Sequence, residues 1–524
     1  MLFNSYEFLF LFLPVVFLGF FWLVRFGHSV GALWLALASL FFYGWWSPKY
    51  VGLLLASIIV NYSLAFLIGH KRNRFQAKLF LIFAISANLA LLGFFKYANF
   101  FIDTANNVSG GSLQLVDIVL PLGISFFTFT QIAFLVDVYR GLAREYNFIH
   151  YLLFVTYFPH LIAGPVLHHG QMMPQFAKRE TYSLQLDNIA LGLSIFTIGL
   201  AKKVLLADNF GDYAGPVFAA AGTGVQPDFI EAWTGSLAYT LQLYFDFSGY
   251  SDMAIGISLL FGVRLPINFN SPYKAANIID FWRRWHMTLS QFLRDYLYIP
   301  LGGNRNGKIL RHLNLMITMV LGGLWHGANW TFVIWGGLHG IYLVINHAWR
   351  SVIADHLPAG GIWASIYHLA AVALTFLCVV VAWIFFRAET YSAAILMFKG
   401  CFGFGGISLP STLGVLSDRF VGLASMLPSG VSYGGVFLNI PGLGSMGGIA
   451  PFAKLLLAGL LIVWFAPNSQ QFFHYVEQTG KSAKLFKAPV SRQQKPVIGF
   501  VLGCLFCLAL SKLDKVSTFL YYQF

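Results

Sequence analysis

Charged residues are scarce in this 524-residue sequence, where they make up 10% of the chain against about 25% in an average soluble domain. Hydrophobic residues make up 58%, and apolar runs close to the roughly 20 residues needed to cross a bilayer recur from end to end. This composition excludes an ordinary water-soluble globular protein. It predicts an all-α polytopic membrane protein with about 11 to 13 membrane segments in one embedded domain.

Acidic residues are fewer still, with 20 Asp and Glu against 33 Lys and Arg, so the net charge is +13. In a soluble protein this excess would suggest nucleic acid. Here the basic residues lie mostly in short loops between apolar runs, where they stay on the cytoplasmic side of a membrane. We therefore expect membrane lipid and no nucleic acid around the chain. The pattern of basic loops places both termini outside the cytoplasm.

Cysteine is also rare: the chain has four, Cys378, Cys401, Cys504 and Cys507, and they lie mostly in apolar runs. They do not indicate a disulfide framework. The lone C-x-x-C pair in a hydrophobic span favours packing over redox or metal chemistry. The first apolar run, Tyr6 to Leu23, lacks a basic start and a small-residue cleavage site, so we expect a retained helix. No internal repeat indicates the inverted symmetry of a secondary transporter.

The single domain over 1–524 divides into three predicted stretches. The core covers about 1–390 and contains a basic cytoplasmic region at 264–311. A Gly-rich outer loop follows at 391–450, and C-terminal spans occupy 451–524. Within the core, the sequence Phe158-Pro-His-Leu-Ile-Ala-Gly-Pro165 breaks a helix twice, so we expect a re-entrant segment near 148–170.

Charge is concentrated in one stretch, from Asp280 to His326. It contains three motifs: Asp280-Phe-Trp-Arg-Arg-Trp-His286, Leu293-Arg-Asp-Tyr-Leu-Tyr-Ile-Pro-Leu-Gly-Gly-Asn304 and Gly322-Gly-Leu-Trp-His-Gly-Ala-Asn-Trp330. The last motif lies in an apolar run of about 38 residues between Arg311 and Arg350, which as one helix would be about 57 Å long. Two helices that turn around Gly327–Trp330 would fit a membrane and place His326 deep within it.

His326 is a candidate general base, because an ionisable group at membrane depth is costly and a neutral imidazole can take a proton from a hydroxyl. Trp325, Asn329 and Trp330 would shape a ligand site beside it. The alternative is a structural histidine bonded to a helix carbonyl. His286 follows three residues after Arg283, on the same face if that stretch is helical, and either a catalytic or an interfacial role fits it.

A phosphate-bearing ligand is the second expectation, because guanidinium groups bind phosphate and aromatic residues alternate with them here. The candidate binding residues are Arg283, Arg284, Trp285 and Tyr296. These cations could instead be topogenic and face lipid. Asp246 lies in or at the end of an apolar span and could anchor basic residues or orient a catalytic group.

We expect no metal, because His339 and His347 do not share the helix face of His326 closely. No Cys or carboxylate cluster completes a ligand set.

Five motifs in this order resemble those of the membrane-bound O-acyltransferase (MBOAT) family. The bacterial branch of alginate and polysaccharide O-acetyltransferases typified by AlgI is the most similar, and the D-alanyl transferases typified by DltB are more distant. The matching segments are Phe158–Pro165, Phe245–Gly256, Phe281–His286, Arg294–Arg305 and Gly322–Trp330, with the tail Phe519–Phe524.

The resemblance implies helices around a central funnel in a bacterial inner membrane, with His326 catalytic and His286 as the second motif histidine. It implies acetyl-CoA as the acyl donor and acetylation of an exopolysaccharide such as alginate. The polysaccharide would receive the acetyl group indirectly, through periplasmic acetyl-transfer or polysaccharide-export proteins. Three alternatives stay open: a D-alanyl transferase with a carrier-protein donor, a transporter of an acyl-bearing solute, and an inactive export scaffold.

Overall fold

The computed structural model describes residues 1–71, 73–143, 147–162, 164–353, 360–408, 431–432, 440, 449–473, 495–513 and 519–520. Helices dominate this part of the chain, as the sequence predicts. Five of them are long and apolar enough to cross a membrane: Phe8–Phe26, Lys49–His70, Arg74–Ser109, Leu186–Gly222 and Gly361–Arg387. Four shorter apolar helices accompany them. The strands within the described ranges are β1 (Ile407–Ser408) and β2 (Val431–Ser432), which pair in parallel.

The first half of the chain forms a succession of helices with π-helical turns between some of them. In chain order they are η1 (Phe8–Phe12), α1 (Leu13–Leu23), η2 (Val24–Phe26), α2 (His28–Gly44), α3 (Lys49–His70), α4 (Arg74–Leu92), η3 (Gly93–Tyr97), α5 (Ala98–Ser109), α6 (Ile124–Tyr139), α7 (Phe148–Thr156), α8 (Phe158–Leu161), α9 (His169–Phe176), η4 (Arg179–Tyr182), α10 (Leu186–Ala201), η5 (Lys202–Ala207), α11 (Asp208–Gly222) and α12 (Phe229–Leu260).

The second half begins with short helices and then forms a long hairpin. Its elements are η6 (Pro272–Lys274), α13 (Ile278–Trp282), α14 (Met287–Leu293), η7 (Arg294–Tyr298), α15 (Gly307–His326), α16 (Trp330–Ile353), α17 (Gly361–Arg387), α18 (Tyr391–Cys401), α21 (Ile449–Phe465), α22 (Ser469–Phe472) and α23 (Lys495–Leu510).

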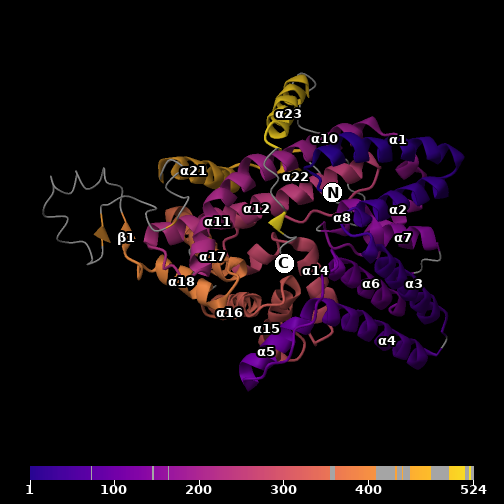
Figure 1. Cartoon of the computed structure of the whole chain (residues 1–524). Coiled ribbons are helices and arrows are strands. Elements are labelled where there is room, and N and C mark those ends of the chain that lie inside the picture. The colour runs from indigo at the N-terminus through magenta and orange to yellow at the C-terminus, as the bar shows by residue number, and fades with distance from the viewer. Residues whose placement is uncertain are drawn as a thin grey trace.

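The central helix is α12, which passes near the middle of the molecule beside α10 and α11 (Figure 1). A capping box starts it, because Asp228 Oδ1 accepts from the Glu231 N–H at 2.8 Å and Glu231 Oε2 accepts from the Asp228 N–H at 3.0 Å. Nearly all its residues are buried. Close approach to α10 depends on Gly199, where an added Cβ would lie 2.6 Å from the Gly249 carbonyl oxygen.

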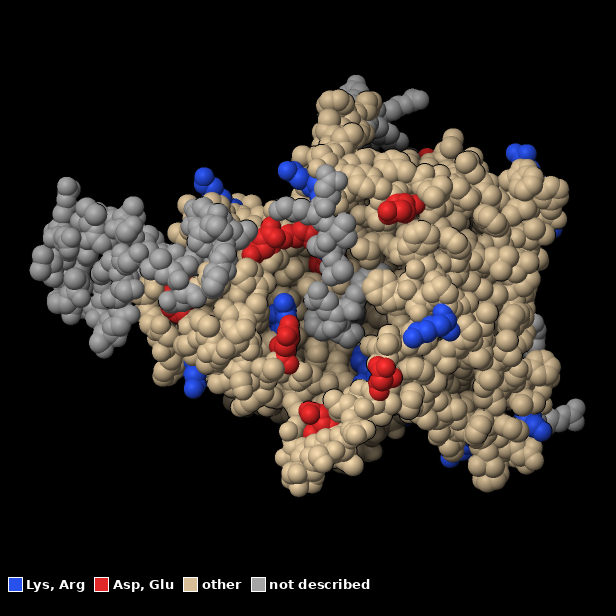
Figure 2. Space-filling view, viewed as in Figure 1, with Lys and Arg blue, Asp and Glu red and all other residues tan. Residues whose placement is uncertain are grey.

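The outer surface is apolar over wide areas, as expected for a protein surrounded by lipid. Figure 2 shows few Lys, Arg, Asp and Glu side chains on a largely uncharged face. Large side chains such as Phe10, Leu18 and Phe83 are more than half exposed along the helices that could cross a membrane. In water this exposure would be a liability, whereas in a bilayer it faces hydrocarbon.

Two predicted stretches differ in detail. The Gly-rich loop expected over 391–450 begins as helix α18, and most of 409–448 lies outside the described residues. The segment expected to break near 148–170 does so: α7 ends at Thr156, the four-residue α8 follows, and α9 starts only at His169. Pro159 stands in the first turn of α8, where its missing N–H costs no hydrogen bond.

Candidate functional site

The candidate site is built at the end of α15, where His326 is the last helical residue. The chain turns over residues 327–329 and α16 begins at Trp330, so the predicted helical hairpin and its turn are confirmed. The two helices approach closely because both carry glycine at the crossing. A Cβ added to Gly323 would collide with the Phe332 carbonyl oxygen, and one added to Gly336 with that of Met319. This packing fixes the direction in which α15 presents His326.

Aromatic rings surround the His326 imidazole, which is only 5% exposed. The ring centroids of Trp325, Trp335 and Phe386 lie 4.9, 5.1 and 5.1 Å from that of His326, and all three pairs meet edge to face. Water is therefore excluded from most of the imidazole, and apolar surroundings favour its neutral form, which can accept a proton.

His286 is the second histidine of the site, with its ring centroid 6.3 Å from that of His326. A helix face shared with Arg283 would require a continuous helix here, and the structure shows an interruption instead, because α13 ends at Trp282 and α14 begins at Met287. Between them His286 adopts the left-handed region, with φ of 42°, a conformation uncommon for a residue with a side chain. The bend turns His286 inward to full burial while Arg283 is exposed.

Asn268 fixes the tautomer of His286. Its Oδ1 accepts from the Thr288 hydroxyl at 2.9 Å and lies 3.1 Å from His286 Nδ1, so Nδ1 carries the proton and donates. The lone pair of the neutral ring is then on Nε2. A histidine oriented in this way can accept a proton or a hydrogen bond at one defined atom.

A pocket of about 130 Å³ opens beside His326. It extends toward the start of α6 and the end of α2, where Gly123, Ser125 and Trp46 line it, and Ile162 of the broken segment forms part of its wall. A larger pocket, of about 460 Å³, lies beside Met287 and Thr288, the residues that follow His286. Arg283 and Arg294 line that second pocket. His326 thus lines the first pocket, whereas the residues that directly follow His286 line the second.

Lys96 is a site residue that the sequence reasoning missed. Its ammonium group donates to the carbonyl oxygens of Trp325 at 2.6 Å and His326 at 3.1 Å, and to the Ser125 hydroxyl at 3.3 Å. Tyr97 adds a hydrogen bond to the Leu324 carbonyl at 2.8 Å. A cation is favourable at a helix C-terminus, where carbonyl groups lack intrahelical partners. Lys96 therefore holds the turn that carries His326.

Two signals could have identified Lys96. It is a single cation inside an apolar run of the sequence, Leu79–Phe101, the same situation that singled out His326. In the structure it lies in the π-helical turn η3, an insertion often found at functional sites.

Asn329 and Trp330 occupy the hairpin turn and have partners away from the imidazole. The Asn329 amide donates to the Glu389 carbonyl at 2.8 Å, and its oxygen accepts from the Thr331 N–H at 3.1 Å. Trp330 is 51% exposed and donates to the Thr104 hydroxyl at 3.3 Å. Neither lines the His326 pocket.

The structure does not gather the four predicted phosphate-binding residues in one site. Arg283 is exposed and lines the larger cavity. Arg284 forms an ion pair with Asp280 at 2.9 Å on the same short segment. Trp285 is buried and packs on Trp383 with ring centroids 4.9 Å apart. Of these, Arg283 alone faces a cavity large enough for a ligand.

Tyr296 belongs to a separate hydrogen-bond network. Its hydroxyl donates to Asp137 Oδ2 at 2.8 Å and lies 3.1 Å from His168 Nδ1, while His169 Nδ1 lies 3.3 Å from the same carboxylate oxygen. Burial lowers the pKa of His168. Because the Tyr296 hydroxyl already donates to Asp137, its oxygen accepts from His168 Nδ1. This network joins η7 to the end of α6 and the start of α9.

Asp246 acts as an anchor in the core of α12. It pairs with Lys203 at 2.7 Å, and its other oxygen accepts from the Leu520 N–H at 3.1 Å. Lys203 also binds Asp208 at 2.8 Å. One helical turn and a half further along, Asp252 binds Lys202 at 2.7 Å and the Ser469 hydroxyl at 2.6 Å. Both carboxylates tie C-terminal segments to the central helix. Asp246 is not among the residues that line the His326 pocket.

The site places a buried imidazole beside a pocket, where it could exchange a proton with a bound molecule. Across the described ranges, no group of three or more His, Cys, Asp or Glu side chains is arranged to hold a metal ion.

Comparison with known proteins gives this arrangement a context. The profile of MBOAT, the membrane-bound O-acyltransferase family, matches residues 17–379. A peptidoglycan O-acetyltransferase of Helicobacter pylori is 46% identical over 437 residues, which cover 78% of this chain and 81% of the relative. A probable alginate O-acetylase AlgI of Pseudomonas aeruginosa is 44% identical over 411 residues, covering 77% and 75%. A teichoic acid D-alanyltransferase of Streptococcus thermophilus is 30% identical over 251 residues, covering 46% and 60%.

Proposed function

The chain belongs to the membrane-bound O-acyltransferase family and is an acyltransferase, and we propose that it moves acetyl from cytoplasmic acetyl-CoA to an extracytoplasmic acceptor in polysaccharide O-acetylation. The observation that carries the proposal is the buried His326 imidazole beside a pocket, at the tip of a helical hairpin. The extensive similarity to two O-acetylating relatives favours acetyl as the group transferred.

His326 is the general base in this proposal. It takes the proton of the acceptor hydroxyl as the oxygen attacks the thioester carbonyl of the donor. The tetrahedral intermediate then collapses, the carbon–sulfur bond breaks, and the imidazolium returns a proton to the departing thiolate. The products are an acetyl ester and CoA with a free thiol, so protons and electrons balance without an additional reactant.

The two cavities suggest how donor and acceptor meet. The larger one carries Arg283 and Arg294, whose guanidinium groups suit the phosphates of CoA. The smaller one begins at the start of α6, whereas the basic residue Arg140 follows the other end of this 16-residue helix, about 24 Å away. Under the positive-inside rule, the acceptor pocket then opens on the periplasmic face of the inner membrane.

His286 supports the reaction from the donor side. Its Nε2 carries the lone pair because Nδ1 donates to Asn268. Nε2 can therefore accept a hydrogen bond from an N–H or O–H group of the bound acetyl-CoA. Periplasmic transfer or export proteins would then receive the acetyl group and deliver it to the polymer. The polymer belongs to the class of envelope glycans that includes alginate and peptidoglycan.

Transfer of D-alanine is the alternative reaction. It is less well supported, because the D-alanyltransferase relative matches 46% of this chain, whereas the two O-acetylating relatives match more than three quarters. The donor decides between the two reactions.

The test measures free thiol release by the purified protein in nanodiscs, with acetyl-CoA or with a D-alanyl carrier protein as donor. We expect release from acetyl-CoA by the wild type and a loss of at least 100-fold in His326→Ala. The matched control is His347→Ala, because His347 lies on α16 and does not line the pocket. Release from the D-alanyl carrier alone would contradict the acetyl-CoA assignment.

A further inference from the structure

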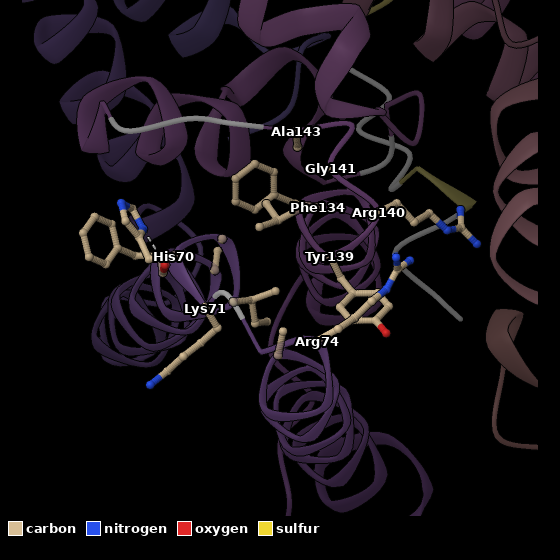
Figure 3. A pocket seen from close by; sticks show the side chains of 14 residues that line it. His70, Lys71, Arg74, Phe134, Tyr139, Arg140, Gly141 and Ala143 are labelled. Carbon is tan, nitrogen blue, oxygen red and sulfur yellow. Dashed lines mark hydrogen bonds between the residues drawn. The ribbon is translucent and has the colours of Figure 1, made fainter.

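A third cavity lies away from His286 and His326, between the ends of α3 and α6 and the start of α4. Its volume is about 300 Å³. His70 and Lys71 lie on one side of it in Figure 3, and Arg74, Tyr139 and Arg140 on the other. Phe134 and Ala77 are among the apolar residues that complete the lining. The proposed acyl transfer makes no use of this cavity.

The position of the cavity corresponds to the boundary between lipid and water. α3 is long and apolar enough to cross a membrane and ends at His70, and the next such helix begins at Arg74. The shorter apolar helix α6 ends at Tyr139. Beside the cavity, Phe66 and Phe75 are 49% and 67% exposed. Helices that end together in this way place their terminal residues at the depth of lipid headgroups.

The charge of the cavity is positive. Lys71, Arg74 and Arg140 line it, and the described residues of its lining include no Asp or Glu. In the described part of the chain, none of these three cations forms an ion pair. Arg74 lies over the Tyr139 ring and Lys71 over the Phe80 ring, each 5.8 Å from the ring centroid, and Arg140 donates to the Asp295 carbonyl at 3.4 Å.

Helix dipoles only partly offset this charge. The C-termini of α3 and α6 each contribute about half a negative charge, whereas the N-terminus of α4 contributes about half a positive charge. Three full cations therefore leave the cavity strongly positive. Topology alone would require basic residues on this side of the membrane, but it would not require a cavity between them.

We propose that this cavity binds the phosphate headgroup of an anionic phospholipid. The two guanidinium groups supply planar donors that suit phosphate oxygens, and Lys71 adds a mobile cation on a flexible stem. The acyl chains lie outside the cavity, along the exposed Phe66 and Phe75 side chains. Basic pockets between helices on the cytoplasmic side are a recognised setting for anionic headgroups. The inference is independent of the acyl-transfer proposal.

The site would also connect lipid to the tyrosine network described above. Arg140 lies over the Tyr296 ring, 5.5 Å from its centroid, and Tyr296 binds Asp137 on α6, the helix that Arg140 directly follows. A bound phosphate that holds Arg140 would therefore stabilise the contact between α6 and η7.

Native mass spectrometry of the full-length protein in detergent tests the inference. The probes are phosphatidylglycerol and phosphatidylcholine with identical acyl chains, and the variant is Arg74→Gln with Arg140→Gln. We expect phosphatidylglycerol to bind the wild type in preference to phosphatidylcholine, and the double variant to bind it about 30-fold more weakly. The matched control removes the same charge from two exposed residues elsewhere, through Lys178→Gln with Arg179→Gln, and should bind within threefold of the wild type.

Three results would overturn the inference. The first is equal binding of the two lipids by the wild type, and the second is an equal loss in both double variants. The third is displacement of phosphatidylglycerol by an equimolar concentration of inorganic phosphate, which would identify a site for free phosphate. Arg74→Lys with Arg140→Lys keeps the charge, so weak binding there with retained thermal stability would support recognition by the guanidinium groups.

Discussion

Replacement of Lys96 by methionine tests whether a buried cation positions the catalytic turn. Methionine has a similar unbranched length and no donor, so the packing of η3 is largely kept. The substitution removes the donor to the carbonyls of Trp325 and His326, which lie 2.6 and 3.1 Å from the ammonium nitrogen. The hydrogen bond to Ser125, at 3.3 Å, is lost as well.

The expected effect is larger on turnover than on stability. Two hydrogen bonds to a charged group contribute about 3–6 kcal/mol together, but methionine avoids the several kcal/mol that burial of an ammonium group costs. The free energy of unfolding should therefore change by about 2 kcal/mol or less. The end of α15 loses its anchor, however, and a displacement of about 1 Å can lower the rate about 100-fold.

The assay is steady-state thiol release from acetyl-CoA, with thermal unfolding measured on the same preparations. We predict that kcat falls about 100-fold in Lys96→Met, while KM for the donor stays within threefold because the donor cavity is not touched. Lys78→Met is the matched control, since Lys78 is an exposed lysine on α4. Wild-type kcat in a folded Lys96→Met protein would refute the positioning role.

Three further predictions concern the frame around the site. Gly336→Ala should lower the yield of folded protein, because the new Cβ would collide with the Met319 carbonyl oxygen. Gly337→Ala has open space around the new Cβ and should raise stability by up to about 1 kcal/mol. Thermal unfolding of the two variants measures the difference in stability. Asp246→Asn should lower stability by about 1.5–3 kcal/mol, because it weakens the buried pair with Lys203, which keeps its pair with Asp208. Unfolding in a denaturing detergent would measure the loss, and an unchanged midpoint would contradict the anchor. Tyr296→Phe should cost about 1–3 kcal/mol through its lost hydroxyl and leave kcat within a few-fold, and a large loss of kcat at unchanged stability would show a direct role in the reaction.

The sequence predicted the hairpin because two independent physical constraints agree there. An apolar run too long for one crossing, with basic residues at both ends, must turn inside the membrane, and Gly327 and Asn329 mark a place where a helix can stop. The structure ends α15 at His326 and begins α16 at Trp330. The break after α7 was predictable for the same reason, because proline and glycine limit the backbone locally.

The direction of side chains was harder to predict. Arg283 and His286 would share a face of a continuous helix, but the left-handed conformation of His286 separates them, and no residue in this stretch is a glycine that would signal it. The partners of Asp246 depend on Leu520, which is 274 residues away in the chain. Contacts of this range follow from the packing of the whole bundle.

Lys96 shows a different kind of omission. An isolated charge in an apolar span indicates a functional site, but a single lysine is a weaker signal than the cluster of charges between Asp280 and His326. Its partners are backbone carbonyls about 230 residues away, which carry no signature in side-chain sequence.

The general-base role of His326 is the central claim, and chemical rescue tests it most directly. In His326→Ala the lost imidazole leaves a space that adjoins a pocket of about 130 Å³, so free imidazole can reach the position of the missing ring. We predict that thiol release from acetyl-CoA falls at least 100-fold in this variant and is partly restored by millimolar imidazole, with no such effect on the wild type. Wild-type release by His326→Ala without added imidazole would contradict the claim.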